Sequence, residues 1–288
     1  PRNYTQLGSS SYFPLNVTFD RHFSAADPTA NPDFYDANLV RLKYCSGDLW
    51  SGNRTSAESQ TKFWFSGHRI VVAVLDELTA DLAAATAIIV TGESAGGAAV
   101  LTNLDYIAAR FPNAATAGAA IAGFNNWAFP FTGPNKTSRG PGNPSWVDFR
   151  EPAWEAIVEL WDPVMNADCQ RYYAYAPTCM VECYKYKFIR TPLFVFESQA
   201  DSVNLMGHNS LPGLHISTDP SAPPPPPIPV DIMTYLAGWH RNMSTCLAEI
   251  TDQAPGIPSL HGVVGMHASG RHSVPGNPDP RTGNATLG

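Results

Sequence analysis

Residues 87–97, with the sequence AIIVTGESAGG, decide the fold of this chain. The short apolar run over 87–91 ends at a glycine, which is typical of a buried strand followed by a turn. Beyond the turn, apolar residues recur at helical spacing, at Val100, Leu101, Leu104, Ile107 and Ala108. The segment therefore predicts a strand, a sharp turn and a helix in direct succession.

The turn at residues 92–96, Gly-Glu-Ser-Ala-Gly, fits the pattern G-x-S-x-G. In this pattern the serine, here Ser94, lies on a strained turn that exposes its hydroxyl above the sheet. We expect glycine at 92 and 96 because larger side chains there would collide with adjacent backbone. The amino end of the following helix faces the same place, so the Ala95 N–H is a candidate oxyanion donor. A phosphate-binding turn is the alternative, but the sequence lacks both Gly-Lys-Ser/Thr and G-x-G-x-x-G at this position.

A serine nucleophile needs a histidine base and an acid that orients it, and in such folds the acid and then the histidine follow the serine. Asp201 follows the predicted strand Leu193–Phe196 and is the candidate acid, with Glu197 as its rival. The histidines beyond it are His208, His215, His240, His261, His267 and His272. His208 and His215 lie too close in sequence to the candidate acid, and His240 falls within a predicted helix. His261 lies beside a plausible last strand at Val263–Val264 and is the candidate base.

The rest of the chain predicts an α/β-hydrolase-like fold, in which a mostly parallel sheet is flanked by helices. Further strands are expected over residues 39–44 and 117–123, and further helices over residues 56–82 and 231–250. Residues 124–190, rich in Trp, Tyr, Pro and Cys, predict an irregular cap. The proline run within 219–230 predicts a surface loop. We expect one domain over residues 1–288.

The composition limits the classes of partner. Of the 288 residues 44% are hydrophobic and 15% are charged, which allows one large core and excludes wholesale disorder. The net charge of −7 argues against a nucleic-acid partner, because phosphate binding needs clustered Lys and Arg. No stretch approaches the roughly 18 to 20 consecutive apolar residues of a membrane span. The sequence therefore predicts neither a nucleic-acid partner nor a membrane span.

Cysteines and glycosylation acceptors indicate the compartment. Asn-X-Ser/Thr acceptors stand at Asn3, Asn16, Asn53, Asn135, Asn242 and Asn284. Three of the five cysteines, Cys169, Cys179 and Cys183, fall within 15 residues. A zinc site would require a second Cys or His pair at suitable spacing, so we expect a disulfide among these three. Secretion is the predicted destination.

Several stretches resemble the pectin acetylesterase/Notum family. The most specific is Tyr44–Gly52, with the sequence YCSGDLWSG, and it is followed by the G-x-S-x-G turn and by LTNLD at Leu101–Asp105. The similarity continues through Thr191–Phe196 and reaches Pro258–His261. The resemblance implies hydrolysis of carboxylic esters, either acetyl groups on pectin or a fatty acyl group on a secreted signalling protein.

By this resemblance Ser94, Asp201 and His261 form a catalytic triad, with Ala95 as one oxyanion donor and no metal or cofactor. The implied substrate is an acetylated glycan, and Trp50 and Trp127 are candidates to line its pocket. The family's other oxyanion amides come from an upstream Gly-Gly-rich loop, which has no counterpart in this sequence. We therefore expect a sheet without its first strands. The rival function is a homologue that binds glycan or acyl chains without turnover.

Overall fold

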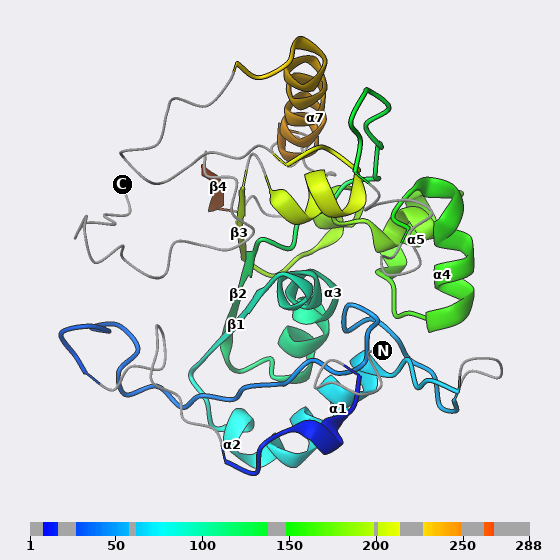
Figure 1. Ribbon diagram of the computed structural model, residues 1–288. Coiled ribbons are helices and arrows are strands. Elements are labelled where there is room, and N and C mark those ends of the chain that lie inside the picture. The colour runs from blue at the N-terminus through cyan, green and yellow to red at the C-terminus, as the bar shows by residue number, and fades with distance from the viewer. Residues whose placement is uncertain are drawn as a thin grey trace.

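A computed structural model describes residues 8–16, 27–57, 62–137, 148–198, 201–213, 227–248 and 262–267. Four parallel strands form one sheet in the order β1-β2-β3-β4 (Figure 1). They are β1 (Ala87–Glu93), β2 (Ala115–Ile121), β3 (Leu193–Ser198) and β4 (Gly262–His267). The predicted strands at 87–91, 117–123 and 193–196, and the one expected near residues 263–264, are confirmed with shifted ends.

Seven α-helices and five 3-10 or π-helical segments occur in the described residues. The helices are α1 (Gly67–Glu77), α2 (Thr79–Ala83), α3 (Ala95–Arg110), α4 (Trp154–Trp161), α5 (Ala167–Tyr172), α6 (Glu182–Lys185) and α7 (Val230–Ala248). The 3-10 or π-helical segments are η2 (Ser10–Tyr12), η4 (Glu151–Ala153), η5 (Ala176–Met180), η6 (Tyr186–Phe188) and η7 (Val203–His208). In Figure 1, α3 lies beside β1 and β2, while α7 and the α1–α2 pair lie at opposite ends of the molecule.

One face of the sheet packs closely on α3. Small residues in β2 allow this approach, since a Cβ at Gly118 would lie 2.6 Å from a methyl carbon of Leu104 and 2.9 Å from one of Val100. Both of these α3 side chains are fully buried. On the other face Ile89 is 54% exposed, and no strand in the described part of the chain pairs with the outer side of β1.

Two predicted elements differ from the structure. Residues 39–44 form no strand, because none of the described segments pairs with them through a ladder of hydrogen bonds; Val40 is 52% exposed, and Tyr44 packs against the core. The helix expected over 56–82 begins only at Gly67, whose N–H donates to the Asp48 carboxylate at 2.7 Å. It is also interrupted at Leu78, where α1 ends and α2 begins. Apolar periodicity alone did not locate these ends.

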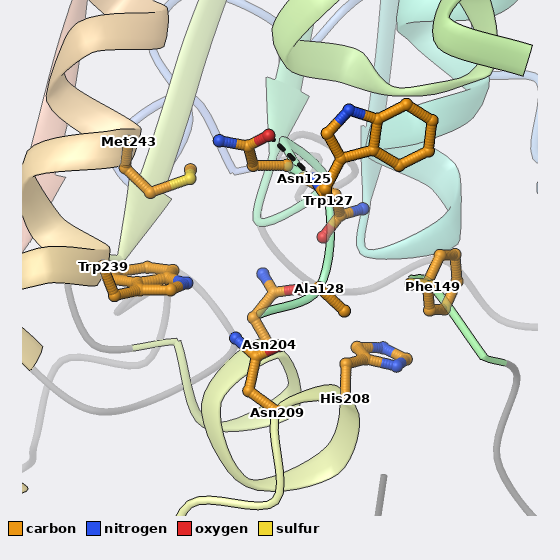
Figure 2. A pocket seen from close by; sticks show the side chains of 10 residues that line it. Asn125, Trp127, Ala128, Phe149, Asn204, His208, Asn209, Trp239 and Met243 are labelled. Atoms are coloured by element: carbon orange, nitrogen blue, oxygen red, sulfur yellow. Dashed lines mark hydrogen bonds between the residues drawn. The ribbon is translucent and has the colours of Figure 1, made fainter. Parts of the chain in front are cut away.

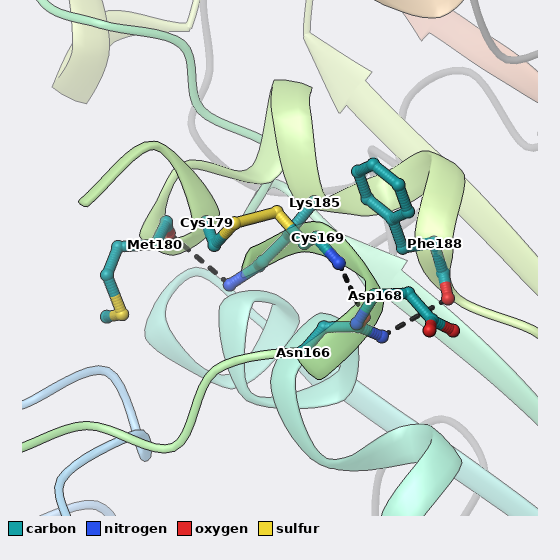
Figure 3. Close-up of a disulfide and its surroundings, with 7 residues drawn as sticks. All are labelled: Asn166, Asp168, Cys169, Cys179, Met180, Lys185 and Phe188. Atoms are coloured by element: carbon teal, nitrogen blue, oxygen red, sulfur yellow. Dashed lines mark hydrogen bonds between the residues drawn. A yellow bond between two sulfur atoms is a disulfide. The ribbon is translucent and has the colours of Figure 1, made fainter. Parts of the chain in front are cut away.

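One disulfide lies within the cap, and a second joins the cap to α7. Cys169–Cys179 joins α5 to η5, and Figure 3 shows it beside Asn166, whose side chain caps α5. The expected disulfide among three neighbouring cysteines is therefore confirmed. Cys183 instead bonds Cys246 of α7, 63 residues away, which local spacing did not reveal. The unpaired cysteine is Cys45.

The cap region contains short helices, as expected, and α7 confirms the helix predicted over 231–250. Most of the proline-rich segment 219–230 lies outside the described residues, so that expectation stays a prediction. None of the helices in the described residues is both long and apolar enough to cross a membrane.

Candidate active site

Ser94 occupies a sharp turn between β1 and α3. Its φ is 57° and its ψ is −121°, a conformation that L-residues other than glycine rarely adopt. Such a backbone costs roughly 1–3 kcal/mol and persists only where the surroundings impose it. The Ser94 N–H donates to the Ile121 carbonyl at 2.9 Å, and the Ser94 carbonyl accepts from the Ala98 N–H at 3.1 Å. Ser94 itself is partly exposed, as a nucleophile that meets substrate must be.

The glycines around Ser94 differ in how closely other backbone atoms approach them. A Cβ at Gly92 would lie 2.3 Å from the Gly96 carbonyl oxygen, and one at Gly97 would lie 2.7 Å from the Ile121 carbonyl oxygen. A Cβ at Gly96 would meet nothing within 4 Å. The predicted collision is therefore confirmed at Gly92. At Gly96 the prediction is wrong, because a side chain there would be free and it is the Gly96 backbone carbonyl that leaves no room for a side chain at Gly92. Sequence reasoning missed Gly97, because its contact comes from β2.

The chain leaving β2 packs directly against the Ser94 turn. A Cβ at Gly123 would lie 2.5 Å from the Ser94 carbonyl oxygen. The next residue is fixed by Glu197, whose Oε2 accepts a hydrogen bond from the Phe124 N–H at 2.9 Å. Glu197 is 2% exposed, and its Oε1 accepts from the Ser198 N–H at 3.0 Å. Glu197, the rival candidate for the acid, thus holds the backbone that supports the nucleophile turn.

Asp201 follows β3 at the same edge of the sheet. It is 0% exposed, and its Oδ1 accepts a hydrogen bond from the Asn204 N–H at 2.7 Å. Because β1 and β3 are parallel and separated only by β2, their carboxyl ends lie about 10 Å apart, at roughly 4.8 Å per strand.

The sequence predicts the histidine base at His261, which lies outside the described residues. Strand β4 begins one residue later, at Gly262, and runs parallel to β3. Its last residue, His267, is opposite Ser198, at the sheet edge where the nucleophile and acid candidates follow their own strands. The register therefore makes His267 a second candidate base. The sequence signal for it was its place three residues beyond the predicted strand residues Val263 and Val264.

The family-like stretch Tyr44–Gly52 forms a loop built around the buried carboxylate of Asp48. Asp48 Oδ1 accepts hydrogen bonds from the Ser46 hydroxyl at 2.5 Å and the Trp50 N–H at 3.1 Å, while Oδ2 accepts from the Gly67 N–H at 2.7 Å. Burial raises the pKa of Asp48 above its ordinary value, and the three hydrogen bonds only partly oppose that rise. This carboxylate therefore holds the loop to the start of α1.

The two tryptophans expected to line a substrate pocket occupy different places. Trp50 is 4% exposed and packs in a core cluster with Val71 and Leu75 of α1 and with Ile107 near the carboxyl end of α3. Its carbonyl accepts a hydrogen bond from Asn103 Nδ2 at 3.2 Å. These contacts are those of a core residue.

Trp127 does line a pocket at the carboxyl edge of the sheet (Figure 2). The pocket lies between the loop after β2, η7 and α7, and its lining residues are Asn125, Asn126, Trp127, Ala128, Phe149, Asn204, His208, Asn209, Trp239 and Met243. Four of these are asparagines, from segments far apart in the sequence. Sequence reasoning missed them, because an isolated Asn in a loop carries no pattern.

Comparison with known proteins places these features. A family model described as "Pectinacetylesterase" matches residues 1–254. The chain belongs to the pectinacetylesterase family. The match ends before His261, so the triad expected from the sequence stays a prediction.

Curated relatives agree with the family. The chain is 33% identical over 204 residues to pectin acetylesterase 5 of Arabidopsis thaliana, covering 69% of this chain and 44% of that protein. It is 28% identical over 253 residues to the human palmitoleoyl-protein carboxylesterase NOTUM, covering 84% of this chain and 47% of that protein. The chain thus spans less than half the length of these relatives.

A solved structure also resembles the fold of this pectinacetylesterase-family chain. The Wnt deacylase Notum from Drosophila superposes with a TM-score of 0.67 at 23% sequence identity, covering 83% of this chain and 64% of that chain. This similarity supports the expected α/β-hydrolase-like fold.

Proposed function

We propose that this protein is a serine carboxylesterase that removes acetyl groups from an extracellular polysaccharide. The observation that carries the proposal is Ser94, held at a φ of 57° between a parallel strand and a helix in a chain of the pectinacetylesterase family. A strained serine at this point is the arrangement that nucleophilic hydrolases use.

Each step of the reaction has a residue assigned to it. The Ser94 hydroxyl attacks the ester carbonyl while a histidine takes its proton. Asp201 orients that histidine and stabilises its cationic form, and the Ala95 N–H donates to the tetrahedral oxyanion. The histidine then protonates the departing alcohol. Water, deprotonated by the same histidine, attacks the acyl-enzyme and releases the carboxylic acid.

The base comes from the C-terminal segment. His261 has the support of the family resemblance, and His267 has the support of its position at the carboxyl end of β4. Substitution of each by alanine separates the two: the true base loses nearly all turnover, while the other variant keeps it. Loss of turnover in neither folded variant would contradict both assignments.

Secretion is part of the proposal. Two disulfides support an oxidising compartment, since such bonds are rare in reducing cytosol. Among the predicted glycosylation acceptors, Asn16, Asn135 and Asn242 are exposed and accessible to modification.

The test is nitrophenol release from a nitrophenyl acetate, with Ser94→Ala beside the unchanged protein. We expect the rate to fall by about 10⁴-fold or more in the variant, as for other lost nucleophiles. Equal, near-background rates in the two folded proteins would overturn the proposal in favour of a binding protein without turnover. A nitrophenyl octanoate in the same assay distinguishes short from long acyl groups, because the named activity of the NOTUM relatives is on a palmitoleoyl group.

A further inference from the structure

A hydrogen bond links the wall of the pocket at the carboxyl edge of the sheet to Asp201, the proposed catalytic acid. Asn204, in its wall, donates its backbone N–H to the Asp201 carboxylate at 2.7 Å. On the other side, the loop that carries Asn125 leaves β2 directly after Gly123, the residue packed against the Ser94 turn. The walls of the pocket are therefore connected to Asp201 through Asn204 and to the Ser94 turn through the chain at Gly123.

One side chain in this pocket, Asn209, is held in a single orientation. Its backbone N–H donates to the Asn204 carbonyl at 2.9 Å, and its carbonyl accepts from the Phe131 N–H at 2.7 Å. Its side-chain amide donates to the Tyr235 hydroxyl, which in turn donates to the Phe129 carbonyl at 2.6 Å. The Asn209 Nδ2 is thus engaged from the α7 side.

The amide oxygen of Asn209 remains without a partner. The residue is 2% exposed, and Oδ1 is buried with no hydrogen bond to any described residue. A buried carbonyl oxygen in this state is costly, and it gains most from a ligand that supplies an O–H or N–H. Figure 2 shows Asn209 beside Asn204, with Trp239 of α7 on one side and His208 on the other.

The size of the pocket limits the ligand group. The cavity has a volume of about 10 Å³, which is close to the space of one water-sized oxygen. A fatty acyl chain is far larger and has no donor, and a carboxylate would bring a second acceptor to the Asn209 oxygen. A hydroxyl group has the required size and the required proton.

We infer that this pocket is a hydroxyl-recognising subsite in which Asn209 Oδ1 accepts a hydrogen bond from a sugar hydroxyl of the polysaccharide substrate. The inference rests on the proposed function and adds a specificity determinant to it. The subsite selects a carbohydrate over a simple ester, because only the carbohydrate presents a hydroxyl beside the ester.

The test compares two substrates in the full chain. For Asn209→Ala we expect KM for a partially acetylated pectic oligosaccharide to rise about tenfold, as for the loss of one hydrogen bond, while kcat/KM for nitrophenyl acetate stays within twofold. Thr234→Ala is the control, since it removes a neighbouring hydroxyl of α7 that donates to the Val230 carbonyl and lies outside the pocket lining, and both substrates should stay near the unchanged values. An equal fall in kcat/KM for both substrates in Asn209→Ala would overturn the subsite. Unchanged kinetics for both substrates would also overturn it and would mean that the pocket holds only water.

A binding measurement makes the inference independent of turnover. Calorimetry with Ser94→Ala should give about tenfold weaker binding of an unesterified pectic oligosaccharide once Asn209→Ala is added. The Ser94→Ala protein, with Asn209 intact, should bind an O-methylated oligosaccharide more weakly than the unmethylated one. This comparison tests the ligand hydroxyl without any substitution at Asn209. Equal affinities in both comparisons would contradict the subsite even if esters are hydrolysed. Absence of any esterase activity together with these affinity differences would overturn the proposed function and leave the subsite standing.

Discussion

Two aspartates, Asp48 and Asp201, are both 0% exposed and lie in very different regions. Asp48 sits in the Tyr44–Gly52 loop, where its two oxygens accept three hydrogen bonds from within the loop and from the start of α1. Asp201 follows β3 at the carboxyl edge of the sheet, and its contact with the Asn204 N–H orders the wall of a pocket. One carboxylate holds the scaffold, and the other stands where parallel α/β sheets place their chemistry.

The two regions show that a distinctive sequence motif can have a structural role while a less distinctive one carries the candidate nucleophile. The nine residues Tyr44–Gly52 are the most distinctive stretch of the resemblance, yet their side chains point to a structural role, with Trp50 packed in the core. The five residues around Ser94 are far less distinctive, yet they form the strained turn. A long signature therefore need not mark the reacting groups.

The largest expected difference between the two regions is in turnover. Asp201→Asn should lower kcat for nitrophenyl acetate by about 10⁴-fold, because the amide stabilises the wrong histidine tautomer, with little loss of folding. Asp48→Asn, assayed on the folded fraction, should keep kcat within about threefold. A comparable kcat loss in both variants would erase the distinction between scaffold and site.

The next effect is on the free energy of unfolding, and here Asp48→Asn should be the more damaging variant. Asp48→Asn should lower the free energy of unfolding by about 3 kcal/mol, because an NH₂ group would face one of the donors that now bond the carboxylate. Urea unfolding followed by tryptophan fluorescence measures this change. A loss below about 0.5 kcal/mol would mean that the loop does not depend on Asp48.

A smaller effect distinguishes neighbouring glycines at the nucleophile turn. Gly97→Ala should force β2 and α3 apart, costing about 1–3 kcal/mol and lowering kcat/KM about tenfold, since its Cβ would lie 2.7 Å from the Ile121 carbonyl oxygen. Gly96→Ala is the matched control, because its Cβ would meet nothing within 4 Å, and both quantities should change little. Thermal unfolding and nitrophenyl acetate kinetics provide the two readouts. If Gly96→Ala proved the more damaging, the packing assigned to this turn would be incorrect.

The smallest expected effect is the pH dependence that Asp48 contributes. Burial raises the pKa of Asp48 in the folded state, so above the ordinary Asp value the folded protein binds more protons than the unfolded chain. Its contribution to stability is complete below the unfolded pKa of about 4 and is lost as pH rises through the folded pKa. The stability difference between the unchanged protein and Asp48→Asn should therefore narrow from pH 4 upward in urea titrations. A difference that widens with pH would mean that the hydrogen bonds outweigh burial.

Local sequence predicted what local forces determine. The strand, the Ser94 turn and α3 were predicted because their apolar periodicity and glycines lie within 25 residues. Residues 39–44 have strand-like side chains but no partner strand among the described residues, and only tertiary structure decides pairing. The Cys183–Cys246 bond joins positions 63 residues apart, so spacing could not reveal it.

The site was predictable in part for the same reason. Ser94 and Asp201 each follow a recognisable strand, and that rule places them at one edge of the sheet. The contact of Gly123 with the Ser94 carbonyl and the unpartnered oxygen of Asn209 arise where separate segments meet. Such contacts leave no pattern in a single sequence.

The most direct test of the central claim, that chemistry resides at Ser94, is covalent labelling by a fluorophosphonate followed by peptide mass spectrometry. We expect a single phosphonylated serine, Ser94, in the unchanged protein and in folded Asp48→Asn, and no labelling in Ser94→Ala. Label on a different serine, or none in the folded unchanged protein, would contradict it.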